Sequence, residues 1–172
     1  MADKDKNTLF LEWLESHSDS VMKVARAYTF TSDDCQDLAQ EILLQAWRSL
    51  PKFEARSAAS TWFYRVALHT AMNWHRSDKP RRSKQKPLLE THARADAAAG
   101  SAEQLQNQDT VEQLYKAIQQ LEAADAALVL LYLEELSYQE MAEVLGITVN
   151  NVGVKLNRAK KALGQLMKEG SL

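Results

Sequence analysis

The stretch that decides the fold is residues 137–166, SYQEMAEVLGITVNNVGVKLNRAKKALGQL. Ser137 and Glu140 have the spacing of a capping box, which starts a helix by satisfying free backbone N–H groups. Gly146 follows where the chain must turn sharply, and Thr148 can cap the next helix. The pattern therefore predicts two helices joined by a tight turn, which is the arrangement of a helix-turn-helix.

The second of these helices has two different faces. Its predicted buried residues recur at helical spacing: Val152, Leu156, Ala159, Leu163 and Leu166. The opposite face carries the candidate contacts to a DNA major groove, which are Thr148, Asn150, Asn151, Val154, Lys155 and Arg158. Lys and Arg neutralise phosphates, and Asn can pair with adenine edges. The alternative is a helical hairpin whose basic face is merely solvated.

Charge is distributed unevenly along the chain. The net charge is -2, which by itself argues against binding to nucleic acid. Residues 52–88, however, contain nine basic and two acidic residues, and residues 146–172 contain five basic and one acidic. Residues 111–145, between them, contain one basic and seven acidic residues. Two separate basic blocks predict two places that meet phosphate.

Composition excludes several classes of protein. The single cysteine, Cys35, cannot form an internal disulfide and is typical of a reducing cytoplasm. The four histidines are scattered, and we find no phosphate-binding loop, nucleophile elbow or zinc-ligand spacing. Neither a signal peptide nor an apolar run of membrane-spanning length is evident. We therefore expect a cytoplasmic protein that is not inserted in a membrane, is not an enzyme, and has no cofactor, metal or small-molecule substrate.

The chain is predicted to be all-α. Only 5 Gly and 3 Pro interrupt a sequence rich in helix-forming residues, and no strand-like alternation is persuasive. Helical periodicity predicts helices near 8–28, 33–50 and 61–76, and four more after residue 109. Residues 83–108 have weak apolar periodicity and predict a flexible linker. We therefore expect two small helical domains, 1–82 and 109–172, joined by a linker over 83–108.

A second signature, DCQDLAQEILLQAW, covers residues 34–47. Leu38, Ile42, Ala46 and Trp47 are predicted to form its buried face. The other face carries Asp37, Gln40, Glu41, Leu44 and Arg48. Carboxylates that meet Arg or Lys form charge-assisted hydrogen bonds and fix the register of a complex. A solvated helix surface is the alternative.

The basic block that follows, KFEARSAASTWFYRVALHTAMNWHRSDKPRR, interleaves basic and aromatic residues over 52–82. This mixture suits single-stranded DNA, because bases stack on rings while basic groups hold the phosphates. The candidate DNA contacts are Phe53, Arg56, Ser60, Arg65, His69, Asn73, Arg76, Arg81 and Arg82. Aromatic residues at helical spacing are more often core, and we expect at least Trp62 to be buried.

These motifs resemble the extracytoplasmic-function (ECF) sigma factors, the small two-domain sigma factors of bacterial RNA polymerase. Residues 136–163 look like the family's region 4, which reads the minus-thirty-five promoter element, and residues 34–47 resemble its region 2. The resemblance covers about residues 9–82 and 110–167. The resemblance implies that region 2 docks on the clamp helices of the largest polymerase subunit through the α-helical face of Asp37, Gln40, Glu41, Leu44 and Arg48. It also implies that region 2 captures a base of the minus-ten element. It also implies contact with the polymerase flap, binding of promoter DNA and control by an anti-sigma factor.

Two positions depart from the family pattern. Gly153 stands where a basic residue is usual, and His69 stands where many relatives carry Asn. Both departures affect the expected base preference. The resemblance implies a sigma factor that directs promoter-specific initiation in response to stress or another signal.

Two other functions fit parts of the sequence. A stand-alone helix-turn-helix regulator would keep residues 137–166 but has no use for the 34–47 signature. A sigma-like decoy that titrates an anti-sigma factor has no need of the two basic blocks.

Overall fold

The computed structural model describes residues 3–85 and 101–171, with side chains for 5–77 and 101–171. Within these residues the chain forms seven α-helices, one short 3-10 helix and no strand, which confirms the all-α prediction. The helices are α1 (Asp3–Tyr28), α2 (Ser32–Ser49), α3 (Ala59–Gln85), α4 (Ala102–Ile118), α5 (Ala123–Leu133), α6 (Tyr138–Leu145) and α7 (Val149–Gly170). The 3-10 helix η1 (Leu50–Lys52) follows α2 directly.

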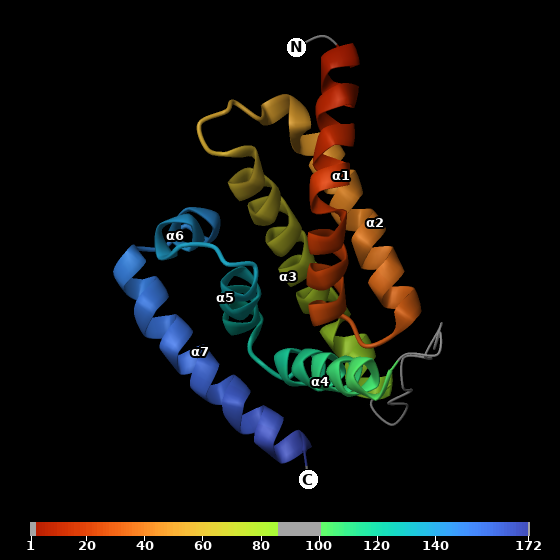
Figure 1. The fold of residues 1–172 in the computed structure, drawn as a ribbon. Coiled ribbons are helices and arrows are strands. Elements are labelled where there is room, and N and C mark those ends of the chain that lie inside the picture. The colour runs from red at the N-terminus through yellow and green to blue at the C-terminus, as the bar shows by residue number, and fades with distance from the viewer. Residues whose placement is uncertain (1–2, 86–100, 172) are drawn as a thin grey trace.

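Helices α1, α2 and α3 pack against one another as a three-helix bundle (Figure 1). The side chains of Leu38, Ile42 and Phe63 are fully buried in its core. Thr31 caps α2, since its hydroxyl accepts a hydrogen bond of 3.1 Å from the backbone N–H of Asp34. At the other end of α2, a proline in η1 ends the regular helix, because proline has no N–H to donate.

Two tryptophans differ from the sequence-based prediction. Trp47 was expected in the core, but 41% of its surface is exposed and its ring packs edge-on against Phe10, 5.1 Å away. Trp62 is only half-buried: its ring packs against the core and lies 4.9 Å from the Trp13 ring and 5.4 Å from the Phe53 ring. Helical periodicity places both residues on an apolar stripe, but it does not show whether a neighbouring helix covers them.

In the second half of the chain, α5 packs on α6 and α7, and α4 packs on α7 and α1. Helix α5 contacts α7 and α6 on one side and α1 and α3 on the other. Six consecutive residues of α5, from Ala126 to Leu131, are buried. A helix that is apolar all round must be covered on every side, so α5 joins the two halves into one continuous hydrophobic core.

The structure describes only the two ends of the expected 83–108 linker. Helix α3 continues to Gln85 and α4 begins at Ala102, so both ends of the 83–108 segment are helical. Ser101 and Gln104 form a capping box that starts α4 ahead of its apolar residues. Residues 86–100, the centre of the expected linker, lie outside the described residues.

Candidate nucleic-acid interface

The turn between α6 and α7 has the geometry that its sequence predicts. The Ser137 hydroxyl accepts from the Glu140 N–H, and the Glu140 carboxylate accepts from the Ser137 N–H, which completes the capping box. Gly146 ends α6 at φ 67°, a left-handed conformation that glycine adopts without strain. The Thr148 hydroxyl then caps α7 by accepting from the Asn151 N–H at 3.1 Å. These contacts confirm the predicted helix-turn-helix.

One face of α7 is buried and the other is open to solvent. Val152, Leu156 and Ala159 are fully buried against α5 and α6, as predicted. Every candidate DNA contact on this helix is exposed: Thr148, Asn150, Asn151, Val154, Lys155 and Arg158. The Val154 side chain, 64% exposed, presents an apolar group in the middle of this polar face. Arg158 forms a long ion pair of 3.6 Å with Asp125 of α5, which orients it along the helix surface.

The candidate docking face on α2 is also exposed. Asp37, Gln40, Leu44 and Arg48 lie on its solvent side, while Glu41 is half-buried. The Gln45 amide donates a hydrogen bond of 2.7 Å to the Glu41 carboxylate and holds that carboxylate in place along the helix. Leu44, 40% exposed, lies among these polar groups and gives the face an apolar centre.

The candidates around the α2–α3 connection have mixed surroundings. Phe53 packs on Trp13 and Trp62 at centroid distances of 5.2 and 5.4 Å, so its ring is partly occupied within the protein. Arg56 pairs with Glu54 at 2.7 Å on a fully solvated loop. The remaining described candidates, Ser60, Arg65, His69, Asn73 and Arg76, are exposed along α3. The side chains of Arg81 and Arg82 lie outside the described residues.

Two aromatic residues of the basic block are core rather than surface. Only 1% of the Phe63 surface and 8% of the Tyr64 surface is exposed. The interpretation of the block as interleaved stacking groups is therefore wrong for these two rings. Phe63 lies against the His17 ring of α1, and Tyr64 turns towards the second half of the chain.

The second half of the chain contacts the α3 candidate surface at Arg65 and beside His69, although both side chains stay exposed. The Arg65 guanidinium donates a hydrogen bond of 2.6 Å to the backbone carbonyl of Glu143 in α6. Beside it lies a cavity of about 410 Å³ between α3 and α6, lined on the α3 side by His69 and Met72. Residues 144–146, at the end of α6 and in the turn that follows, form its other wall.

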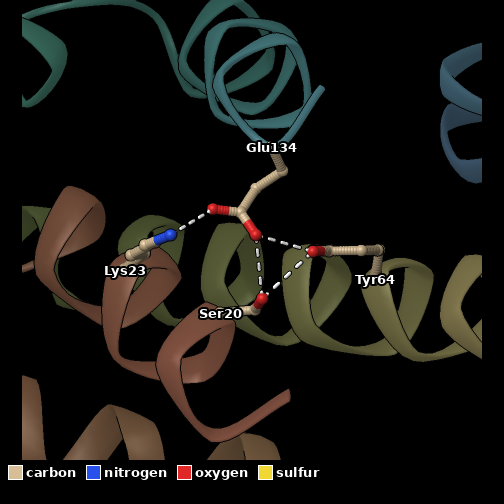
Figure 2. Close-up of polar contacts among 4 residues, drawn as sticks. All are labelled: Ser20, Lys23, Tyr64 and Glu134. Atoms are coloured by element: carbon tan, nitrogen blue, oxygen red, sulfur yellow. Dashed lines mark hydrogen bonds and ion pairs between the residues drawn. The ribbon is translucent and has the colours of Figure 1, made fainter. Parts of the chain in front are cut away.

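Glu134, at the end of α5, joins the two halves through a polar cluster (Figure 2). Its Oε1 accepts from Lys23 Nζ at 2.7 Å, and its Oε2 accepts from the Tyr64 hydroxyl at 2.8 Å and from the Ser20 hydroxyl at 2.9 Å. Only 17% of the Glu134 side chain is exposed. We call Glu134, Ser20, Lys23 and Tyr64 the Glu134 cluster.

The charges of this cluster reinforce one another. Burial alone would raise the pKa of Glu134, but the hydrogen bonds from Lys23, Tyr64 and Ser20 outweigh it and hold the pKa below the ordinary value of a glutamate. The hydrogen bond to Glu134 raises the pKa of Lys23, and burial raises the pKa of Tyr64 to about 12. Around neutral pH the carboxylate and ammonium are therefore both charged and the phenol keeps its proton.

A second polar contact lies at the end of α1. The Gln119 amide nitrogen donates to the backbone carbonyls of Arg26, at 2.9 Å, and Thr29, at 2.7 Å. The last carbonyls of a helix have no partner within the helix, so this side chain from the second half caps α1. The Tyr28 hydroxyl donates to the Ala123 carbonyl at 2.7 Å, and the Arg26 guanidinium lies 4.2 Å from the centre of the Tyr115 ring.

Sequence reasoning missed both of these contacts. Glu134 and Gln119 are ordinary polar residues at helix ends, and nothing in their local pattern indicates a distant partner. The apolar run over residues 126–131 does indicate packing against other parts of the chain, because it predicts a helix that must be covered on both sides.

Comparison with known proteins shows the family to which the chain belongs. Residues 13–81 match the model for Sigma-70 region 2, and residues 111–163 match the model for Sigma-70, region 4. The chain is 32% identical over 150 residues to the RNA polymerase sigma-H factor of Pseudomonas aeruginosa, covering 81% of this chain and 76% of that protein. The chain belongs to the extracytoplasmic-function sigma factors of RNA polymerase. Its function is accordingly that of a sigma factor in the initiation of transcription.

Other relatives agree with this assignment. This sigma factor is 30% identical over 140 residues to the ECF RNA polymerase sigma-E factor of Escherichia coli K12, with 77% of this chain and 73% of that one covered. It is 29% identical over 166 residues to the sigma factor YlaC of Bacillus subtilis, covering 88% and 94% of the two chains. Residues 3–85, with α1 to α3, are hereafter called region 2, and residues 101–171, with α4 to α7, are called region 4.

Solved structures share the fold. The sigma factor RpoE of Bartonella quintana, in complex with the anti-sigma factor NepR, superposes with a TM-score of 0.66 at 20% identity, covering 92% of this chain and 96% of that one. CnrH, in complex with the cytosolic domain of CnrY, gives 0.62 at 19% identity, covering 95% and 90%. In the described part of this sigma factor, no helix is long and apolar enough to span a bilayer.

A glycine inside α7, Gly153, gives a test of how tightly this helix packs beside Tyr138. A Cβ added at Gly153 would lie 3.5 Å from the Tyr138 ring, an ordinary van der Waals contact. Because glycine is about 1 kcal/mol less favourable than alanine inside a helix, Gly153→Ala should raise the free energy of unfolding by roughly 0.5–1 kcal/mol. Chemical denaturation measures the change. As a control, Gly146→Ala should destabilise the protein, since Gly146 has a positive φ. A lower free energy of unfolding in Gly153→Ala would contradict this expectation, because it would mean that the added methyl group clashes with the Tyr138 ring.

Proposed function

We propose that this sigma factor binds core RNA polymerase through α2 and reads promoter DNA with α3 and α7. The observation that carries the proposal is the exposed face of α7, where amide, apolar and basic side chains follow a capped helix-turn-helix. A recognition helix placed in a major groove needs this combination, with Asn150 and Asn151 near its N-terminus to contact base edges. Lys155 and Arg158 follow one and two turns later and can hold phosphates.

We assign core binding to Asp37, Gln40, Glu41, Leu44 and Arg48. Their exposed, mixed-charge face with Leu44 at its centre has the anatomy of a protein interface, with polar groups around an apolar contact. The clamp helices of the largest polymerase subunit are the proposed partner, and the flap is the proposed partner of region 4. Residues 1–82 and 109–172 are the proposed functional units, with 83–108 as their connection.

We assign the minus-ten element to the α2–α3 connection and the exposed side of α3. Arg56, Ser60, Arg65, Asn73 and Arg76 supply the polar and basic groups, with Arg81 and Arg82 continuing the same helix. Phe53 and His69 are the proposed wall of a pocket for an unstacked base. The half-buried Trp62 and Phe53 replace the buried Phe63 and Tyr64 as the rings available at this edge.

The protein is proposed to act in the cytoplasm, where polymerase is, and to be no enzyme itself, because the chemistry of transcription belongs to polymerase. We infer an anti-sigma factor as its regulator and a stress or other signal as the trigger. Support comes from the similar Bartonella quintana structure, which contains an anti-sigma factor.

Transcription with purified core polymerase tests the proposal. With a library of random promoter sequences, we expect initiation from a subset that shares two spaced motifs, only when this sigma factor is present. Polymerase binding without initiation would favour a sigma-like decoy. DNA binding without polymerase binding would favour a stand-alone regulator and contradict the proposal.

The α2 face is tested by charge reversal. Asp37→Lys together with Glu41→Lys should weaken polymerase binding by on the order of tenfold or more, because charge-assisted contacts become repulsive. Binding is measured by titration of labelled polymerase. Glu15→Lys, an exposed acidic position on α1, is the matched control and should leave the affinity unchanged. Equal affinity in the double variant and the control would place the polymerase contact elsewhere.

The α7 face is tested promoter by promoter. Lys155→Ala should lower initiation several-fold on promoters that depend on the upstream motif, since a phosphate contact contributes affinity there. Promoters that work without this motif should keep their activity. Lys168→Ala, in the last turn of the same helix, is the control for a general loss of charge. A uniform loss on both promoter sets would refute the assignment of α7.

A further inference from the structure

The outward side of α7 repeats its buried side at a fixed offset (Figure 1). The fully buried residues of this helix are Val152, Leu156 and Ala159. At about 3.6 residues per turn, a shift of two residues turns a helix by about 200°, so the positions two residues earlier point away from the protein. Those positions hold three exposed residues, which we call the outer stripe: Asn150, Val154 and Asn157.

Basic side chains flank the outer stripe rather than occupy it. Lys155 and Arg158 each follow a stripe residue by one position, which places them about 100° round the helix. The Arg158 guanidinium lies 3.6 Å from the Asp125 carboxylate of α5, which draws it towards the protein. On the other flank, Gly153 has no side chain. Base edges that face the centre of α7 therefore meet two amides and a valine.

Val154 is an unusual residue for the place that it occupies. Its exposed fraction, 64%, is the highest among the large hydrophobic residues in the part of the chain that the structure describes. Branching at its Cβ restricts the side chain, so valine is a weaker helix former than alanine or lysine. Val154 thus contributes little burial and little helix propensity here, and its methyl groups are available for an apolar contact with a partner.

The chemistry of the outer stripe matches A·T base pairs. An asparagine side chain can accept a hydrogen bond from the adenine N6 amino group and donate one to adenine N7. The thymine methyl group is the apolar group that a major groove presents, and small apolar side chains pack on it. Guanine is read most often by Arg or Lys, and neither residue type occurs in the outer stripe.

The spacing of the outer stripe fits neighbouring base pairs. A helix rises about 1.5 Å per residue, which puts about 6 Å between positions 150 and 154 and about 4.5 Å between 154 and 157. Base pairs are about 3.4 Å apart, so the stripe spans about four consecutive pairs. It lies in the first three turns of α7, and the N-terminal part of a recognition helix is the part that reaches the bases.

We propose that the outer stripe sets the base preference of region 4: Val154 contacts the methyl group of a thymine, and Asn150 and Asn157 read adenines on either side of it. The inference rests on the proposed function, because α7 must enter a major groove. It adds a class of target sequence, since the upstream motif is then rich in A·T pairs and depends on a thymine methyl group. It also adds Asn157 to the residues assigned to DNA.

The methyl contact is tested with deoxyuridine, which differs from thymidine only by the loss of that methyl group. The sigma factor and core polymerase are bound to promoter duplexes selected from the random library, and each thymine of the upstream motif is replaced in turn. At one position we expect the affinity, measured by fluorescence anisotropy, to fall about threefold to fivefold, as the loss of one methyl contact predicts. Val154→Ala should bind both duplexes equally, because the partner of the methyl group is gone.

Two further variants complete the test, with circular dichroism to show that each is folded. Val111→Ala, which shortens an exposed valine of α4, is the matched control and should keep the wild-type response to deoxyuridine. Asn157→Ala should select promoters that have lost the preference for adenine at one position of the upstream motif, by on the order of tenfold, and have kept the rest of the motif.

The inference is overturned if the upstream motif contains no A·T pair or if no thymine in it responds to the loss of its methyl group. It is also overturned if Val154→Ala responds to deoxyuridine as the wild type does. These results leave the proposed function intact, since the chain still directs initiation. Initiation that does not depend on the chain contradicts the proposed function and the inference together.

Discussion

The burial of α5 on all its sides is the constraint on which the rest of the structure depends. Each Leu or Val removed from water contributes roughly 1.5–3 kcal/mol, and the buried run from Ala126 to Leu131 contains four of these residues. Within region 4, α5 packs on α6 and α7. The remaining side of α5 is covered by α1 and α3, so the apolar requirement of one short helix draws region 4 onto region 2.

Polar contacts give this association its orientation. Apolar burial is non-directional, whereas Glu134 accepts from three donors on α1 and α3 and Gln119 fits the free carbonyls at the end of α1. Glu134 is held in place by its backbone: the next residue, Glu135, adopts φ 61°, and the Leu136 N–H bonds back to the Leu131 carbonyl. A non-glycine residue in this conformation is uncommon, and here it ends α5 with the carboxylate directed at region 2 (Figure 2).

Local features were predictable from sequence, and distant ones were not. The capping box at Ser137, the turn at Gly146 and the buried side of α7 follow from short-range hydrogen bonding and helical period. They are confirmed, except that Leu163 and Leu166 of the predicted buried side are only half-buried. Trp47 and Tyr64 were misplaced because periodicity finds an apolar or aromatic position without showing what packs on it. The Glu134 cluster joins Glu134 to residues 70, 111 and 114 positions away, so no local pattern could indicate it. The assignments of individual residues to polymerase or DNA stay predictions.

The most direct measurement of the central claim, that region 4 packs on region 2 in the free chain, is small-angle X-ray scattering of the wild-type protein in dilute solution. We expect a profile that matches the closed arrangement, with one compact distribution of interatomic distances. A larger radius of gyration, with the second maximum that two separated units produce, would contradict the shared core around α5.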